Sequence, residues 1–382
     1  MDPTLPLPLD GIVVIDASRM LPGAVLVRML VDLGARVIKI EDPRSGDLMR
    51  LTPPHEGGVG VGFCAFFRGT ESVTLDLRSE DGAAALRTLS TSADVLLESF
   101  RPGTMDRWGL SLDGLREANA RLITASLPGF AHGDAIGHDL NFVALSGLLV
   151  RLQGEGIPAA QLADCTAGSL ACAAILAALL RRTRTGAGGH ITQPLAQAPL
   201  QFMTWAWAEE SSSGTPTTGQ LLGGSLAAYR TYTCGDGLGI ALGCLEPKFW
   251  ITLCRALQIP ELAAAGLSPG PEGAAAAVRV QSILSQETRD TWLDRLAPLN
   301  LPISPVHDVA AALADPTFDA SGLVEETPLP GGGTLRAPGP SLPSLGRTPS
   351  SPAPLLGAHT RDVLGEFGVA PERVTRIAPN KA

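Results

Sequence analysis

The chain has 382 residues, of which 45% are hydrophobic and 18% are charged, and its formal net charge is −9. This length allows two domains with separate cores, and the composition is that of a globular protein. The acidic balance and the lack of a basic stripe in the sequence argue against a nucleic-acid partner. A few local Arg and Lys residues would still suffice for a phosphorylated ligand.

Segments for targeting or membrane insertion are not evident in the sequence. The start, MDPTLPLPLDG, is neither basic nor a long apolar run, so we expect no signal peptide. The longest uncharged stretch, 165–180, is short for a bilayer and rich in small residues, which favours a buried helix. Six cysteines without metal-type spacing indicate free thiols in a reducing compartment. We therefore expect a cytoplasmic protein with no membrane partner and no bound metal.

Strand and helix patterns alternate through the first third of the chain. Residues 12–15 and 36–41 are typical of strands, and 24–34 between them has helical spacing. Such a unit implies parallel strands joined by a right-handed crossover. Further strand and helix patterns follow at 72–77, 82–93, 94–100 and 115–127. They predict an α/β protein with a Rossmann-like, doubly wound parallel sheet. The loop after the first strand has no GxGxxG, which counts against a nicotinamide dehydrogenase.

The second half suggests a separate, smaller domain. The sequence DGLG is typical of a hairpin turn between two strands. Residues 327–355 are dense in Pro and Gly and are expected to be extended, and a helix over 361–368 is expected to end the fold. The predicted organisation is a large domain over 1–195 completed by 325–382, a linker over 196–225, a small α+β domain over 226–312, and a return linker over 313–355.

Two ionisable residues stand at the start of the apolar segment 142–150, in the sequence IGHDLNFVALSG. Asp139 or Asn141 could accept backbone N–H bonds at a helix start, with Gly137 as the turn. Alternatively, His138 is held at the edge of the core to move a proton. This stretch alone leaves both interpretations open.

Asp164 stands just ahead of an Ala-rich helix predicted over 165–182, at an N-cap position. The same place lets a carboxylate face a helix N-terminus, where N–H groups and the helix dipole stabilise negative charge. The small residues Ala167, Gly168 and Ser169 would let a ligand approach the backbone closely, as an oxyanion site requires.

Other charged residues lie near the ends of predicted strands. Glu246 precedes Pro247 at a strand-to-helix junction, as either an ordinary helix-start acid or a functional carboxylate. Lys39, Arg101 and Arg107 lie at or just beyond strand ends, where open α/β sheets bind ligands. Arginine there suits phosphate groups, and a solvated surface is the alternative.

The ordered set of motifs resembles the family III CoA-transferase and α-methylacyl-CoA racemase (CaiB/BaiF) superfamily. The matching stretches are LDGIVVIDASRMLPG, LVDLGARVIKIEDP, SVTLDLRSEDG, ADVLLESFRPGTMDRWGL, RLITASLPGF, GHDLNFVALSGLL and PLLGAHTRDVLGEFG. They occur in the family's order and span almost the whole chain. The resemblance implies an acyl-CoA substrate, no cofactor besides the CoA moiety of that substrate, and an interlocked homodimer in which the partner's small domain completes each site.

The resemblance also implies the roles of individual residues. Transferases use an aspartate, matched by Asp164, as a nucleophile that forms an aspartyl-CoA thioester. Racemases use it with a histidine, matched by His138, and an acid, matched by Glu246. The presence of both GHDLNF and LEPKFW favours the racemase branch, with a CoA-transferase as the alternative. Residues matching the family's CoA contacts are Leu75, Asp76, Leu77, Arg78, Ser99, Phe100, Arg101, Arg107, Gly137, Asp139, Leu140, Asn141 and Phe142.

Racemisation next to a thioester needs two groups, because one rigid base cannot reach both faces of the carbon. A free imidazole titrates near pH ~6.5 and a free aspartate near ~3.9. Burial of Asp164 and coupling to Glu246 would bring the pKa values of the histidine and the aspartate closer together. Helix N–H donors would stabilise the enolate. Two departures from the family pattern, GGSLAAYRTY and Thr192, predict altered acyl specificity and leave a non-catalytic acyl-CoA-binding relative as a third hypothesis.

Overall fold

The structure is a computed structural model that describes residues 6–133, 135–152, 157–214, 221–320, 322–345 and 351–379. These residues form two compact units. The first takes its residues from Met1–Ser146, Ile157–Leu200 and Pro316–Ala382, and the second from Gly147–Gly156 and Gln201–Asp315. The first unit is therefore assembled from three separate parts of the chain.

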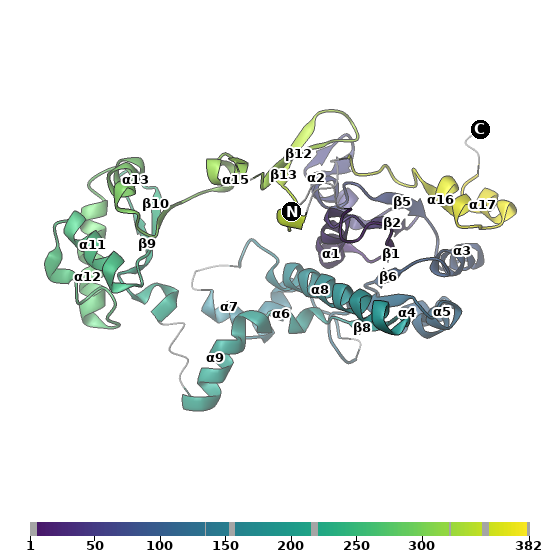
Figure 1. The fold of residues 1–382 in the computed structure, drawn as a ribbon, viewed down its shortest axis with the longest axis horizontal. Helices are drawn as coiled ribbons and strands as arrows, with labels where there is room; N and C mark the ends of the chain where they lie inside the picture. The colour runs from purple at the N-terminus through teal and green to yellow at the C-terminus, as the bar shows by residue number, and fades with distance from the viewer. Residues whose placement is uncertain are drawn as a thin grey trace. The chain divides into compact units, whose positions relative to one another are not determined.

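A six-stranded parallel sheet forms the centre of the first unit (Figure 1). Its strand order, β5-β2-β1-β6-β7-β8, runs outward from β1 on one side and from β6 on the other. This is the doubly wound topology that the sequence predicts, and the α/β prediction is confirmed. The strands are β1 (Val13–Ala17), β2 (Arg36–Glu41), β5 (Glu71–Thr74), β6 (Val95–Glu98), β7 (Ile123–Ser126) and β8 (Gly189–Thr192).

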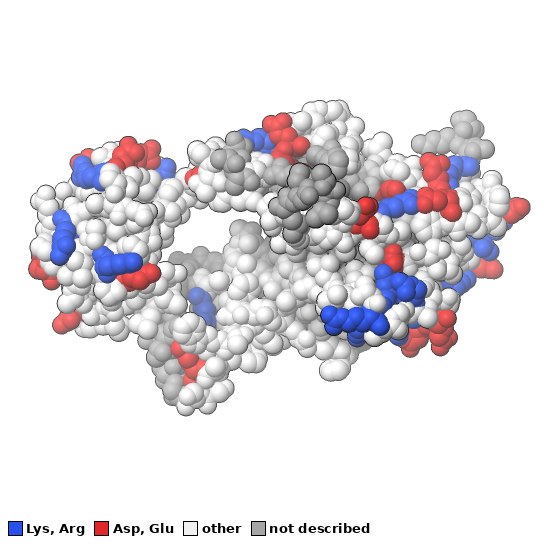
Figure 2. All heavy atoms as spheres, viewed as in Figure 1, with Lys and Arg blue, Asp and Glu red and all other residues white. Residues whose placement is uncertain are grey.

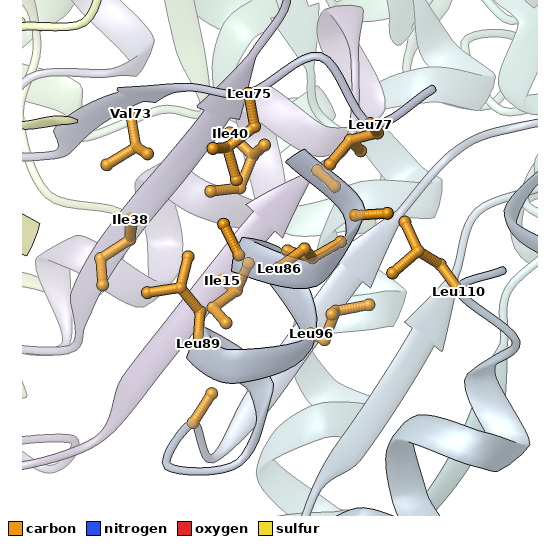
Figure 3. Packing of buried hydrophobic residues seen from close by; sticks show 14 of the residues in the cluster. Ile15, Ile38, Ile40, Val73, Leu75, Leu77, Leu86, Leu89, Leu96 and Leu110 are labelled. Atoms are coloured by element: carbon orange, nitrogen blue, oxygen red, sulfur yellow. The ribbon is translucent and has the colours of Figure 1, made fainter. Parts of the chain in front are cut away.

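Helices pack against the sheet through an aliphatic core. Leu86 and Leu89 of α3 meet Ile15 and Ile38 of the sheet, and all four side chains are fully buried (Figure 3). Each such side chain stabilises the fold by roughly 1.5–3 kcal/mol relative to an exposed one. The helices of this unit are α1 (Met20–Asp32), α2 (Val61–Phe66), α3 (Glu80–Ser90), α4 (Thr104–Arg107), α5 (Leu112–Ala118), α6 (Asp139–Leu145), α8 (Leu162–Thr185), α15 (Pro316–Ala320), α16 (Thr360–Glu366) and α17 (Pro371–Ile377). Short helical turns and a small hairpin complete it: η1 (Leu48–Leu51), η2 (Leu195–Gln197), η6 (Pro343–Leu345), β3 (His55–Glu56) and β4 (Val59–Gly60).

Helix α8 is long and apolar enough to cross a membrane by those two criteria, but it packs along α1. Ala167 and Gly168 face this contact and are buried. A Cβ atom on Gly168 would lie 2.6 Å from the carbonyl oxygen of Pro22. Gly168 therefore serves a close helix crossing, which corrects the prediction that this residue admits a ligand.

The C-terminal segment returns to the first unit and covers the edge strand β5. The backbone N–H of Ser72 donates to His359 Nδ1 at 3.1 Å, and that of Thr74 donates to Thr360 Oγ1 at 3.0 Å. Within the Pro/Gly-rich stretch predicted to be extended, β12 (Val324–Pro328) and β13 (Thr334–Pro338) form an antiparallel hairpin. The predicted last helix exists as α16, but α17 follows it.

Ion pairs join the C-terminal helices to the rest of the unit. Arg36 contacts Glu366 of α16 at 2.5 Å, and Arg376 of α17 contacts Asp81 of α3 at 2.7 Å. On the face drawn in Figure 2, basic and acidic side chains are intermixed. The surface charge on that face is thus of both signs.

The second unit has a three-stranded antiparallel sheet in the order β11-β10-β9. Its core includes Trp250, Leu253 and Tyr232, and the predicted hairpin joins β9 to β10. Its strands are β9 (Tyr229–Thr233), β10 (Gly239–Gly243) and β11 (Ile303–Val306). Its helical segments are α7 (Leu148–Arg151), η3 (Leu221–Ser225), α11 (Pro247–Ala256), η4 (Pro260–Leu262), α12 (Pro271–Leu284), α13 (Arg289–Leu296), η5 (Ala297–Leu299) and α14 (Val309–Leu313).

A 14-residue helix, α9 (Leu200–Ser213), occupies much of the stretch 196–225 that the sequence suggests is a linker. Its first residue, Leu200, ends the middle part of the first unit, and its remaining residues belong to the second unit. Residues 215–220 of this stretch lie outside the described residues, as do 346–350 of the predicted return linker.

Candidate active site

A cavity of about 360 Å³ opens at the carboxyl ends of the parallel strands. It is lined by the loops that follow β1, β2, β5 and β6, on both sides of the point where the strand order reverses. Open α/β sheets bind ligands at this switch point, and the volume suits an organic ligand. Of the residues matched to CoA contacts, Leu75, Asp76, Leu77, Arg78, Ser99, Phe100 and Arg101 line this cavity.

Arg19 also lines the cavity and was not among the residues singled out in the sequence. Its backbone N–H donates to Ser99 Oγ at 2.8 Å, and its guanidinium lies 5.0 Å from the ring centre of Phe100. The next residue, Met20, has a φ of 60°, a left-handed conformation that is strained for a bulky side chain. Arg19 follows β1 directly, so the strand-end rule could have identified it.

Lys39 has a structural position instead of the ligand contact predicted for it. Its side chain is fully buried, and its ammonium lies 3.0 Å from carboxylate oxygens of both Asp16 and Asp47. It also donates to the Ser18 carbonyl oxygen at 3.1 Å. These three partners use the three N–H donors of an ammonium group. We therefore correct the prediction: Lys39 joins β1, β2 and the loop at Asp47.

Two arginines matched to the family's CoA contacts, Arg78 and Arg107, already have partners within the chain. Arg78 donates to Asp76 at 2.8 Å and to Asp42 at 2.9 Å. Arg107 is exposed and donates to Thr104 Oγ1 at 2.8 Å. A ligand phosphate would have to displace these partners or share the guanidinium N–H donors with them.

A second, smaller cavity of about 120 Å³ shares Ser99, Phe100 and Arg101 with the first. Its opposite wall is formed by residues up to Gly137, which directly precedes His138. A Cβ atom on Gly137 would lie 2.6 Å from a ring carbon of Phe142, so only glycine fits there. The smaller cavity therefore lies between the loop after β6 and the segment that leads into α6.

Helix α6 begins one residue after His138, and His138 is its N-cap residue. The cap uses the backbone of His138, whose N–H donates to Asn141 Oδ1 at 3.0 Å and whose carbonyl accepts from the Asn141 N–H at 2.8 Å. The imidazole is exposed and is not needed for this cap. Phe142, matched to a CoA contact, is fully buried against Phe130, so its side chain belongs to the core.

Asp164 lies in the first turn of α8 and not at its N-cap, which is Gln161. Its backbone N–H donates to Asp139 Oδ1 at 3.0 Å. Burial, and then the nearby Asp139 carboxylate, raise the pKa of Asp164 to about 6, while His138 acts in the opposite direction. The structure therefore brings His138, Asp139 and Asp164 together where the N-termini of α6 and α8 meet.

Glu246 belongs to the second unit, where it is the N-cap residue of α11. Its side chain is exposed, and the cap again uses backbone groups, since the carbonyl of Glu246 accepts the Phe249 N–H at 3.0 Å. The strand-to-helix junction predicted for it is present.

Thr192, one of the departures from the family pattern, forms a polar chain across β7 and β8. Its hydroxyl lies 3.0 Å from His190 Nε2, and the hydroxyl of Thr124 lies 2.9 Å from His190 Nδ1. His190 and Thr192 line a third cavity of about 310 Å³, together with Glu98. Among the described residues, no group of three His, Cys, Asp or Glu side chains is arranged to hold a metal ion.

The doubly wound sheet and the cavity at its switch point define an α/β protein that binds its ligand at the strand ends. The model of CoA-transferase family III matches residues 9–360, so the chain belongs to this family. The superfamily predicted from the sequence is thus confirmed.

Known members of the family carry two kinds of activity. Human alpha-methylacyl-CoA racemase is 30% identical and aligns with 98% of this chain and 97% of its own. Acetyl-CoA:oxalate CoA-transferase of Acetobacter aceti is 31% identical, with coverages of 83% and 85%. A CaiB/BaiF family protein from Brucella suis has a solved structure that superimposes with a TM-score of 0.81 at 30% identity, covering 95% of this chain and 100% of that chain. The protein is therefore an enzyme of CoA-transferase family III.

Proposed function

We propose that the protein is a racemase or epimerase of 2-methylacyl-CoA or a related α-branched acyl-CoA thioester. The observation that carries the proposal is the meeting of His138 and Asp164 at the N-termini of α6 and α8, with the pKa of Asp164 raised to about 6. A carboxyl group with this pKa exchanges protons near neutral pH, as a general acid or base must.

In the proposed reaction, one of the two groups removes the α-proton and the other returns a proton to the opposite face. The electron pair of the broken C–H bond is held as an enolate on the thioester oxygen until the new C–H bond forms. Negative charge at that place is favoured by the two helix N-termini. The net result is inversion at the α-carbon with no change in composition.

The CoA moiety is proposed to bind along the two cavities that share Ser99, Phe100 and Arg101. Arg19 and Arg101 line the larger cavity and suit the phosphate groups, because guanidinium donors bind phosphate oxygens in pairs. The smaller cavity ends at Gly137, beside His138, and would guide the thioester to the two proton-transfer groups. Glu246 is proposed as a further acid of the reaction, as its match to the racemase acid implies.

We further propose that the enzyme works as an interlocked homodimer. Helix α9 exposes three large apolar side chains, Phe202, Trp205 and Trp207, which are 53%, 63% and 52% exposed. Large exposed apolar groups grouped on one helix are typical of an interface.

The alternative is a family III CoA-transferase in which Asp164 attacks the thioester. The identity with the Acetobacter aceti transferase and the position of Asp164 at a helix start favour it. The two reactions are separated by one experiment. A racemase incorporates solvent deuterium at the α-carbon of a chiral 2-methylacyl-CoA in D₂O, without an acceptor acid. A transferase leaves the α-proton in place and forms an aspartyl-CoA adduct that hydroxylamine or borohydride traps.

A further inference from the structure

We propose that Asp139 is a positioning residue of this site, because its carboxylate caps helix α8 from the neighbouring helix α6 and places a negative charge beside Asp164. This inference rests on the proposed function only in assigning proton transfer to Asp164. It replaces the expectation that Asp139 serves as a CoA contact.

The capping role follows because α8 has no capping bond from the side chain of its own N-cap residue. The first N–H groups of a helix have no partner within the helix. Gln161, the N-cap of α8, makes no side-chain capping bond, whereas the N–H of Asp164 at the third helical position donates to Asp139 Oδ1 at 3.0 Å. A capping bond that a local side chain normally supplies thus comes from the first residue of α6.

This bond also fixes the distance between the two proposed proton-transfer groups. His138 directly precedes Asp139, so the same hydrogen bond that holds the start of α8 holds the backbone of His138 beside it. Helices α6 and α8 also pack against each other and against η2. The catalytic geometry is therefore set where two chain segments, distant in sequence, are joined by one carboxylate.

The charge of Asp139 has a separate consequence. A second carboxylate close to a half-buried acid disfavours its ionisation, and Asp139 is the largest cause after burial of the raised pKa of Asp164. His138 has the opposite effect and lowers the pKa of Asp164. Several elements with titratable or charged residues pack against α8. These residues are His138 and Asp139 at the start of α6, Arg28 and Asp32 on α1, and His190 on β8. On α8 itself, Cys165 adjoins Asp164.

The two roles can be separated by substitution. Asp139→Asn keeps an oxygen that accepts the Asp164 N–H but removes the charge, whereas Asp139→Ala removes both. We expect Asp139→Asn to move the acid limb of the kcat/KM profile to lower pH by roughly 1 unit, with no loss of melting temperature. We expect Asp139→Ala to show the same shift, a lower melting temperature and a further loss of kcat. Asp362→Asn, a first-turn carboxylate of α16, is the matched control and should change neither.

The experiment follows both activity and the carboxyl group itself. The Asp164 resonance, identified by its loss in Asp164→Asn, is titrated by ¹³C NMR in the full-length protein with ¹³Cγ-labelled aspartate. A lower titration midpoint in Asp139→Asn supports the inference. An unchanged midpoint together with weaker CoA binding would overturn it and restore the role as a CoA contact. If the wild type exchanges no α-proton, the proposed function fails, but this titration still decides the role of Asp139.

Discussion

Gly168 of α8 lies directly against Pro22 of α1, so that the backbone of one helix touches the carbonyl of the other. This crossing sets where α8 passes along α1, and Asp164 lies one turn before it. The last residue of β1, Ala17, and the loop residues Ser18 and Arg19 that precede α1 line the larger cavity. One glycine therefore couples the position of the proposed catalytic carboxyl group to the cavity that holds the proposed CoA moiety.

Gly168→Ala should destabilise the fold by about 1–3 kcal/mol, the usual cost of overpacking a core. The added methyl would lie 2.6 Å from the Pro22 oxygen and 2.9 Å from Val25 Cβ. Urea unfolding measures the change. The control is Gly365→Ala, a helical position with nothing within 4 Å of the added atom, which should gain up to ~1 kcal/mol from helix propensity. Equal stability of the two variants would contradict this account of the crossing.

Asp164→Asn should stabilise the protein at pH 8 but not at pH 4. The folded pKa of Asp164 is about 6, above the ordinary aspartate value of 3.8, so the folded state holds this proton more tightly. Its ionisation therefore costs stability as the pH rises through this window, and the asparagine removes that cost. We expect a gain on the order of 1 kcal/mol at pH 8, discounted for partial exposure. Thermal unfolding at both pH values measures it, and a gain of the same size at pH 4 would be inconsistent with a raised pKa.

Lys39→Met should lower the free energy of unfolding by about 3–5 kcal/mol, because it leaves two buried carboxylates without their cation. Those carboxylates belong to Asp16 and Asp47, each 3.0 Å from the ammonium. The exposed Lys248→Met is the control, with an effect within ~0.5 kcal/mol. If Lys39→Met were stable and bound CoA weakly, the original prediction of a ligand contact would be restored.

Arg101→Ala should weaken CoA binding by about tenfold, the loss expected for a charged hydrogen bond. Arg101 lines all three cavities at the strand ends, whereas Arg107 donates to Thr104 and should have the smaller effect. Calorimetric titration with CoA compares the two variants with Arg279→Ala, an exposed arginine on α12. A larger loss in Arg107→Ala would instead identify Arg107 as the main phosphate contact.

The elements that local patterning specifies were the ones that could be predicted. The stretch RVIKIE alternates β-branched residues, and β2 spans Arg36–Glu41 as predicted. Strand ends are also local, which is why Arg101 could be placed at the cavity from the sequence pattern, whereas Leu75–Arg78, Ser99 and Phe100 were placed there by the family resemblance. The hairpin over β12 and β13 was missed because its pairing is hidden in a Pro/Gly-rich composition.

What could not be predicted depends on partners distant in sequence. Helix α8 starts at Leu162, earlier than its pattern indicates, with a capping bond from Asp139 that no local rule reveals. Likewise, Lys39 at a strand end resembles a ligand-binding residue until Asp16 and Asp47 are seen around it. Gly168 resembles a residue that lets a ligand approach the backbone until its contact with α1 is seen. In each case a residue type fits two roles, and only the tertiary contact chooses between them.

The most direct test is α-proton exchange by His138→Ala in D₂O, measured separately on each enantiomer of a 2-methylacyl-CoA. With the imidazole removed, Asp164 alone should exchange the α-proton of one enantiomer and leave the other enantiomer unlabelled, while inversion stops. Labelling of both enantiomers at the wild-type rate would show that His138 moves no proton, and the two-group reaction proposed for this chain would be wrong.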